Sequence, residues 1–207
     1  MTTPGEGGSG PAFFDVVLAQ RACRSFRPDP VPDELVERVL TAATHAPSAE
    51  NRQPWVFVVV RDPDVRRGIA DLARQLWHGG ARAFSAERTS ARLLADVGRG
   101  VDQGLEEAPV VVVVAGDEEA GLAVTLPSSV YLAAQNLCLA ANALGLGSAF
   151  TTLPTLQTEE LRALLGLPLH VHPMVVVPLG WPARPLGPPR RAPVGEKTHR
   201  DRYGNRW

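Results

Sequence analysis

Residues 107–117 read EAPVVVVVAGD, and this stretch decides the fold class. The apolar run after Pro109 is rich in β-branched residues and predicts a buried strand over 110–115. Two further runs, WVFVVV at 55–60 and HPMVVVPL at 172–179, predict two more strands. These three runs are the strand component of the predicted fold.

Helical patterns occupy most of the remaining chain. Apolar residues recur at helical spacing over 13–20, 33–43, 65–76 and 158–165, and the poorly patterned segment 78–99 is also expected to be helical. Residues 128–144 are apolar almost all round, which is typical of a central helix. The predicted fold class is therefore α+β, in a single domain of residues 13–207.

Length and composition exclude several classes of protein. A chain of 207 residues with 44% hydrophobic and 21% charged residues suits one folded domain. Its net charge of -1 predicts no nucleic-acid partner, and its apolar runs are too short to span a membrane. Residues 1–12 predict a flexible tail without a secretory signal, and two cysteines are too few for a disulfide framework, so we expect a cytoplasmic protein.

Two residue clusters resemble ligand motifs only superficially. Gly98, Gly100 and Gly104 have the wrong spacing for a dinucleotide loop, and no predicted strand precedes them. His170 and His172 would share one face of a strand, but no third ligand lies nearby in the sequence. We therefore expect structural histidines and no metal site.

Cys23 is a weak candidate for a nucleophile. It lies beside Arg21 and Arg24, whose charges favour a thiolate. No histidine is paired with it in the sequence, so the simpler interpretation is a small residue in a tight turn.

Two constellations remain open from the residues alone. Arg21 and Arg24 lie near one end of the chain and Arg190 and Arg191 near the other; such pairs bind a phosphate if they converge and are solvated surface if they do not. The polar loop PSAENRQPW at 47–55 follows a helix and precedes a buried strand, a position where loops often bind ligands. The alternative is a turn whose polar side chains bond their own backbone.

Four stretches in a fixed order resemble the FMN-dependent nitroreductase family. They are RACRSFRPDPVPDELVERVLTAATHAPSAENRQPWVFVVV at 21–60, EAPVVVVVAGD at 107–117, AAQNLCLAANALGLGS at 133–148, and MVVVPLGWPARP at 174–185 followed by PPRRAP at 188–193. The resemblance implies a nitroreductase-like fold, in which helices flank a mainly antiparallel sheet. It also implies an intertwined homodimer with FMN bound at the subunit interface.

The resemblance places the basic motif at 20–24 on the cofactor. Arg21 falls where the family binds the FMN phosphate or ribityl chain, and Arg24 falls near the pyrimidine edge of the flavin. A cation at that edge would stabilise the negative charge that reduction places there. Gln20 and Ala22 stand where the family commonly has arginine and serine, which changes two contacts.

Three further segments are implied to complete the site. The loop at 47–51 matches a Pro-Ser-x-x-Asn loop that reaches the flavin from the neighbouring subunit. Residues 151–153 match the segment that hydrogen-bonds flavin N5, and residues 190–191 match a late basic pair at the phosphate. The expected cofactor-binding residues are Arg21, Ala22, Arg24, Pro47, Ser48, Asn51, Thr151, Thr152, Leu153, Arg190 and Arg191.

The implied activity is reduction of a nitroaromatic, quinone or other electron-poor small molecule by a ping-pong hydride transfer from NAD(P)H through FMN. The cofactor carries this chemistry, so no catalytic side chain is expected. Residues 77–92 and Phe150 are expected to line the acceptor pocket.

Three alternatives stay open. The Thr-Thr-x-Pro run at 151–154 also resembles the reductive dehalogenases related to iodotyrosine deiodinase, although the expected lid at 79–94 contains Glu87 and no tyrosine. An oxygen-using, flavin-cleaving branch that makes dimethylbenzimidazole is the second alternative. A non-catalytic flavin- or deazaflavin-binding protein is the third.

Overall fold

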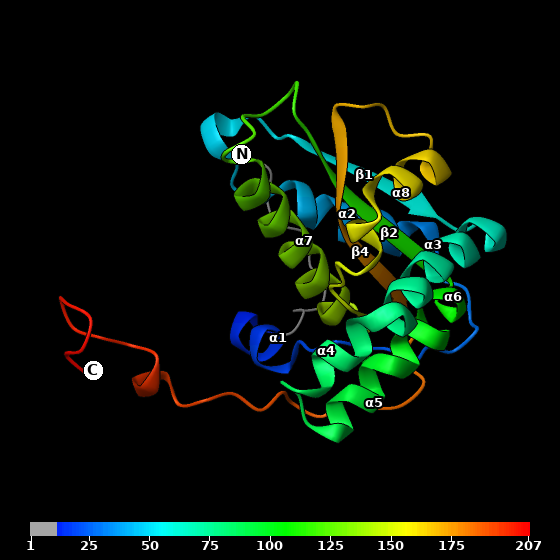
Figure 1. Ribbon diagram of the computed structural model, residues 1–207. Coiled ribbons are helices and arrows are strands. Elements are labelled where there is room, and N and C mark those ends of the chain that lie inside the picture. The colour runs from blue at the N-terminus through cyan, green and yellow to red at the C-terminus, as the bar shows by residue number, and fades with distance from the viewer. Residues whose placement is uncertain (1–11) are drawn as a thin grey trace, which may run out of the picture.

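Four strands form one sheet in the order β1-β2-β4-β3 in this computed structural model, which describes residues 12–207 (Figure 1). The strands are β1 (Trp55–Val60), β2 (Val110–Asp117), β3 (Gly147–Ser148) and β4 (Val171–Gly180), and each neighbouring pair is antiparallel. All three predicted strands are therefore present, and the antiparallel sheet is confirmed. Except for Ala12, the expected flexible tail at 1–12 lies outside the described residues.

β2 lies in the middle of the sheet and is buried on both faces. Because successive side chains of a strand point to opposite faces, Val110, Val112 and Val114 join one core cluster. Val111 and Val113 join a second cluster on the other face. Burial on both sides explains why the sequence shows a run of valines without polar alternation.

Helices cover both faces of the sheet (Figure 1). The long helix α7 (Leu126–Ala143) and α2 (Asp33–Thr44) supply the first cluster, and α1 (Phe13–Ala19) packs against α7. On the other face lie α3 (Pro63–Leu76), α6 (Leu105–Glu107) and α8 (Thr158–Leu165). The start of α3 is set locally, because the Asp62 carboxylate accepts hydrogen bonds from two backbone amides of the first turn.

The segment between α3 and β2 differs from the expected continuous helix. It consists of η2 (Trp77–Ala81), α4 (Arg82–Ala86), α5 (Ala91–Arg99) and η3 (Gly100–Gly104). Residues 87–90 form a turn, after which the Ser90 hydroxyl caps α5 by accepting from the amide of Leu93. The helical region also continues through η3 and α6, which the sequence pattern did not predict.

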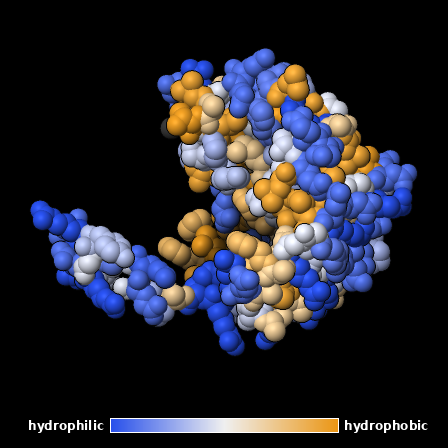
Figure 2. Space-filling model, in the orientation of Figure 1, coloured by the Kyte–Doolittle hydropathy of each residue, from blue (hydrophilic) through white to orange (hydrophobic). Residues whose placement is uncertain are grey.

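Residues 184–207, here called the C-terminal arm, extend away from the body of the molecule (Figure 1). The arm contains only the short η5 (Val194–Glu196), and Figure 2 shows it as a largely hydrophilic projection. It carries seven of the 21 Lys and Arg residues but two of the 22 Asp and Glu residues. Within residues 12–207, no helix has the length and apolar character needed to cross a membrane.

Candidate functional site

The basic turn after α1 is attached to β3. The amide of Cys23 donates a hydrogen bond to the carbonyl oxygen of Ser148 at 2.8 Å, and Ala22 forms a parallel bridge with the same serine. Cys23 is buried, and a Cβ on Gly147 would lie 2.6 Å from its Sγ atom. This close packing fixes the backbone from which Arg21 and Arg24 extend.

A cavity of about 80 Å³ brings Arg24 and Thr151 together. Apolar side chains of α5, η3, α6 and β4 form part of its wall. The other lining residues are Arg24, Gly100, Gly104, Ala149, Phe150 and Thr151. Two predicted cofactor-binding segments, far apart in the sequence, therefore meet at one cavity.

Residues 151–153 follow β3 and run beside β4. The amide of Thr151 donates to the carbonyl oxygen of Val176 at 3.1 Å, and the amide of Val176 donates back at 2.8 Å. Within residues 12–207, the amides of Thr152 and Leu153 donate no hydrogen bond. These two donors are available to a ligand, because unpaired backbone N–H groups otherwise need a partner.

The loop at 47–51 is attached to the start of α7. The amide of Ala49 donates to the hydroxyl oxygen of Ser129 at 3.3 Å, and the amide of Gln53 donates to the hydroxyl of Ser48 at 3.0 Å. Asn51 has a φ of 54° and is exposed. Figure 1 shows this loop at the upper end of α7, away from α4 and α5.

This loop does not line the cavity that Arg24 and Thr151 share. None of Pro47, Ser48 and Asn51 contributes to that cavity. Within one chain, the loop and the cavity are therefore separate. A site that uses both needs a second copy of the chain to supply one of them.

Arg190 and Arg191 are exposed on the C-terminal arm. The base of the arm lies beside the basic turn, because Arg21 Nη1 donates to the carbonyl oxygen of Gly187 at 2.8 Å. Among the described residues, the two later arginines form no ion pair, and Arg191 donates only to the carbonyl oxygen of Arg190. The structure thus brings Arg21 to the arm, while the Arg190 and Arg191 side chains stay in solvent.

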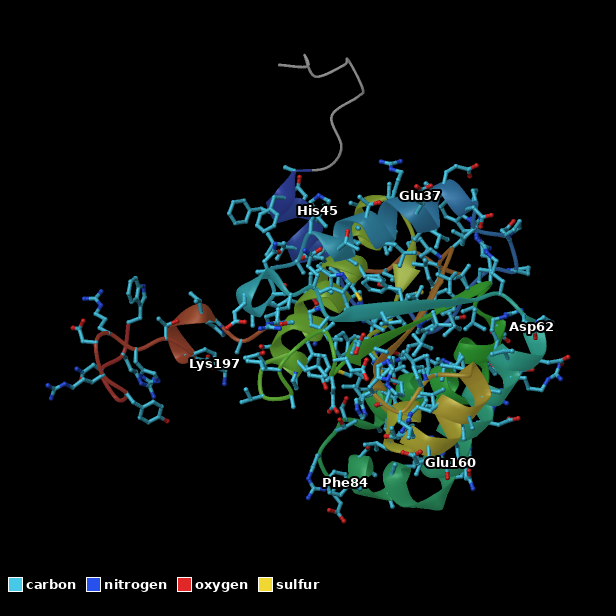
Figure 3. All side chains as sticks on the ribbon, turned by 90° about the horizontal axis from the view of Figure 1, so that it is seen from above. Glu37, His45, Asp62, Phe84, Glu160 and Lys197 are labelled. Atoms are coloured by element: carbon cyan, nitrogen blue, oxygen red, sulfur yellow. The ribbon has the colours of Figure 1, made fainter. Side chains whose placement is uncertain are left out.

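The expected acceptor pocket is only partly matched. Phe150 lines the cavity, but Trp77 is buried in the core with 3% of its surface exposed. Phe84 on α4 is 63% exposed, with the guanidinium of Arg88 3.9 Å from its ring centre. Figure 3 shows Phe84 at the outer edge of the body. Trp77 is therefore corrected to a core residue, since η2 turns its indole inward.

Three residues contact Arg24 that the sequence did not identify as part of the site. A Cβ on Gly104 would lie 2.4 Å from the Arg24 carbonyl oxygen, and a Cβ on Gly100 would lie 2.7 Å from its Cδ. Asp96 accepts a hydrogen bond from Arg24 Nη1 at 2.8 Å. In the sequence, Gly100 and Gly104 are one helical turn apart, and this spacing indicates a helix face on which another segment can pack closely.

Burial and local ion pairs describe the surroundings of the two cysteines and the paired histidines. Burial raises the pKa of the Cys23 thiol, opposite to what a nucleophile needs, and burial also raises the pKa of Cys138 to about 11. His170 Nδ1 lies 3.5 Å from a Glu119 carboxylate oxygen, and His172 Nε2 lies 3.2 Å from one of Glu118. In the part of the chain that the structure describes, no group of His, Cys, Asp and Glu could hold a metal.

A larger groove of about 580 Å³ contains none of the predicted site residues. Both of its arginines donate hydrogen bonds to backbone carbonyl oxygens. Arg66 Nη1 donates to the carbonyl oxygens of Glu106 and Ala108, both at 2.6 Å, and Arg61 Nη2 donates to that of Val31 at 2.9 Å. We therefore place the candidate site at the smaller cavity.

Comparison with known proteins gives consistent matches over most of the chain. The model of the Nitroreductase family matches residues 17–181. NADH dehydrogenase of Thermus thermophilus is 36% identical over 193 residues, which cover 86% of this chain and 90% of that protein. The 5,6-dimethylbenzimidazole synthase of Rhodospirillum rubrum is 34% identical over 208 residues, with 92% and 93% covered.

A solved structure adds a bound cofactor to these comparisons. Oxidized iodotyrosine deiodinase bound to FMN and 3-iodo-L-tyrosine aligns with a TM-score of 0.72 at 28% sequence identity. The alignment covers 93% of this chain and 98% of that chain. The family match includes the basic turn, the 47–51 loop and residues 151–153, and it ends before the C-terminal arm.

Proposed function

Since this chain belongs to the nitroreductase family, we propose that it is an FMN-dependent oxidoreductase that uses NAD(P)H to reduce an electron-poor small molecule such as a nitroaromatic or a quinone. The observation that carries this proposal is the cavity shared by Arg24 and Thr151. Arg24 brings a cation to this cavity, and Thr151 brings the segment whose next two residues, Thr152 and Leu153, carry the unpaired amides. A cation and hydrogen-bond donors suit the polar edge of a flavin.

The residues present fit FMN by their chemistry. The guanidinium of Arg24 suits the pyrimidine edge, where reduction places negative charge. The unpaired amides of Thr152 and Leu153 are hydrogen-bond donors for the flavin ring, and Arg21, Arg190 and Arg191 offer guanidinium groups to its phosphate. Ala22 would approach the cofactor only through its backbone, since its side chain has no polar atom.

The size of the cavity supports a site that two chains complete. Pockets for molecules of this size usually measure about 300–1,000 Å³, whereas this cavity measures about 80 Å³. In our proposal the loop at 47–51 of a second copy encloses the rest of the cofactor, with Pro47, Ser48 and Asn51 facing it. A single chain would then bind FMN weakly.

Surface features of the chain support the homodimer. Phe13, Phe14 and Leu18 on α1 are each at least 67% exposed, so among the described residues nothing covers this apolar face. The arm is basic, while the remaining residues of the sequence include 14 Lys and Arg against 20 Asp and Glu. This charge difference favours an arm that lies on the body of a second copy.

When bound, FMN would supply the chemistry of hydride transfer between a nicotinamide and the acceptor. The protein holds the flavin and limits access to it. Arg24 stabilises negative charge at one edge, and the amides of Thr152 and Leu153 orient the other. No side chain is assigned as a catalytic acid or base.

Two related activities are the alternatives. The 34% identity to a 5,6-dimethylbenzimidazole synthase, over nearly the whole of both chains, favours a flavin-cleaving activity as the second candidate. Reductive dehalogenation is less well supported, because residues 77–99 contain no tyrosine and offer Glu87 as the exposed carboxylate of the α4–α5 turn. A flavin-binding protein without turnover would respond to neither nicotinamide.

The test is an anaerobic absorbance scan of the purified protein reconstituted with FMN. NADH or NADPH should bleach the flavin spectrum, and a nitroaromatic or a quinone should restore it. Bleaching without restoration, followed by loss of flavin when oxygen is admitted, would support the flavin-cleaving alternative. A bound flavin that ignores both nicotinamides, or no affinity for FMN, would contradict the proposal.

A further inference from the structure

Asp96 on α5 is a meeting point for arginines from three segments. Its Oδ2 accepts from Arg24 Nη1 at 2.8 Å, and its Oδ1 accepts from Arg99 Nη2 at 2.9 Å. Arg184, at the base of the C-terminal arm, lies 3.9 Å from Oδ1. The Asp96 side chain is 24% exposed, so this carboxylate is partly shielded from water.

Asp96 controls the direction of the Arg24 guanidinium. Among residues 12–207, it is the one group that accepts a hydrogen bond from Arg24. Gly100 lies against the stem of Arg24, where an added Cβ would lie 2.7 Å from Cδ, and Gly104 lies against its backbone, where an added Cβ would lie 2.4 Å from the carbonyl oxygen. Because a guanidinium has five N–H donors, the donors that Asp96 leaves unused can serve a ligand in the cavity.

Asp96 also lowers the positive charge that the cavity receives from Arg24. The two side chains are 25% and 24% exposed, so water screens the pair less than it screens the exposed ion pairs of the surface. Full positive charge beside a flavin stabilises its reduced, anionic form more than its oxidised, neutral form. A carboxylate at 2.8 Å from Arg24 therefore opposes that preference.

We propose that Asp96 is a positioning residue that aims Arg24 at FMN and sets the reduction potential of the bound flavin by partly neutralising its charge. The inference rests on the proposed function, because it requires FMN beside Arg24. Asp96 does not itself touch the reacting atoms. Its effect on the reduction potential is electrostatic, whereas a residue needed only for folding would change stability and leave the potential of bound FMN unchanged.

The test measures the midpoint potential of bound FMN and the dissociation constant of oxidised FMN from the apoprotein. Asp96→Asn keeps an oxygen for Arg24 and removes the negative charge. The ratio of the dissociation constants for oxidised and reduced FMN should therefore rise by at least tenfold, which corresponds to a potential higher by about 30 mV for two electrons. Asp102→Asn is the matched control, because this nearby carboxylate pairs with His78 and does not contact Arg24; it should leave the potential unchanged.

Two further variants separate charge from structure. Asp96→Glu retains the carboxylate and should keep the wild-type potential. A change of tenfold or more in its ratio of dissociation constants for oxidised and reduced FMN would overturn the proposal. This test holds even if Asp96→Asn folds poorly. In an Arg24→Gln background, Asp96→Asn should lose its effect. Equal shifts with and without Arg24, or equal potentials for Asp96→Asn and wild type, would also overturn it.

The proposed function can fail separately. If the wild-type protein binds no FMN, the proposed function is wrong and the Asp96 proposal is overturned with it. If wild type binds FMN and is reduced by a nicotinamide while Asp96→Asn leaves both measurements unchanged, the proposed function stands and only the role of Asp96 is wrong.

Discussion

Arg21 donates a hydrogen bond from Nη1 to the carbonyl oxygen of Gly187 at 2.8 Å, across 166 residues of sequence. The basic turn after α1 and the base of the C-terminal arm are thereby joined. The amide of Ala183 donates to the carbonyl oxygen of Ser25 at 3.0 Å and strengthens the connection. Groups from both ends of the chain can therefore act on one ligand, which is the basis of the predictions for Arg21, Arg191 and the C-terminal arm.

Arg21→Ala and Arg191→Ala should each weaken FMN binding. Each variant removes a charge-assisted hydrogen bond to the phosphate, worth about 1.5–3 kcal/mol, so the dissociation constant should rise by about 10- to 150-fold. Fluorescence titration of the apoprotein with FMN measures the change. Arg38→Ala, on the exposed surface of α2, is the control and should bind FMN as wild type does; unchanged affinity in both test variants would refute the phosphate assignment.

Heterodimers should reveal whether the site is shared between chains. Arg24→Ala and Ser48→Asp should each inactivate a homodimer, the first by removing the cation and the second by placing a carboxylate near an anionic cofactor. If each site uses Arg24 of one chain and Ser48 of the other, a mixed dimer retains one intact site. About half of the wild-type activity should return in purified, doubly tagged heterodimers, and no recovery would argue for sites built within single chains.

Removal of residues 185–207 should weaken both dimerisation and FMN binding. The truncated chain loses Arg190 and Arg191 together with the basic charge of the arm. Light scattering after size-exclusion chromatography should show a shift towards monomer, and the flavin should be lost on the column. A shorter truncation that removes residues 198–207 keeps both arginines and should retain FMN. A long truncation that stays a flavin-loaded dimer would contradict the role given to the arm.

Gly104→Ala should destabilise the protein and disturb Arg24. The new Cβ would lie 2.4 Å from the Arg24 carbonyl oxygen, and overpacking of this kind costs about 1–3 kcal/mol. Urea unfolding of the apoprotein measures the free energy change. Gly79→Ala is the matched control, because a Cβ there has no neighbour within 4 Å; it should be neutral or stabilise by up to about 1 kcal/mol. Equal stability of the two variants would show that the backbone yields at Gly104.

Cys138 should make stability fall at alkaline pH. Burial raises the pKa of its thiol from 9.0 to about 11 in the folded protein. Below pH 9 the thiol is protonated in both states, and its contribution is fully present. Between pH 9 and 11 only the unfolded chain loses the proton, so about 2–3 kcal/mol of stability is lost as pH rises. Cys138→Ala should show a shallower decline than wild type in urea unfolding across this range, and parallel curves would disprove the assignment.

The strands and most helices could be predicted from the sequence, because their patterns are local. Five consecutive valines from Val110 need burial whatever surrounds them, and apolar residues at helical spacing over 65–76 predict most of α3. The family and its antiparallel α+β fold were likewise recognisable from four ordered stretches, and the comparisons confirm both. The helix boundaries within residues 77–107 were not predicted, because a turn at 87–90 interrupts the helical pattern. The close packing of Gly100 and Gly104 against Arg24 was not predicted either, because it depends on a distant segment.

The sequence by itself determined which residues carry charge and which must be buried, because these properties belong to single side chains and to short periodic patterns. Only the tertiary structure decided which of them meet. It placed Arg24 with Thr151 at one cavity, set Asp96 against Arg24, and kept the loop at 47–51 away from that cavity. The physical reason is that such contacts depend on how α5, η3 and β4 pack, and no local pattern encodes a distance between segments more than 70 residues apart.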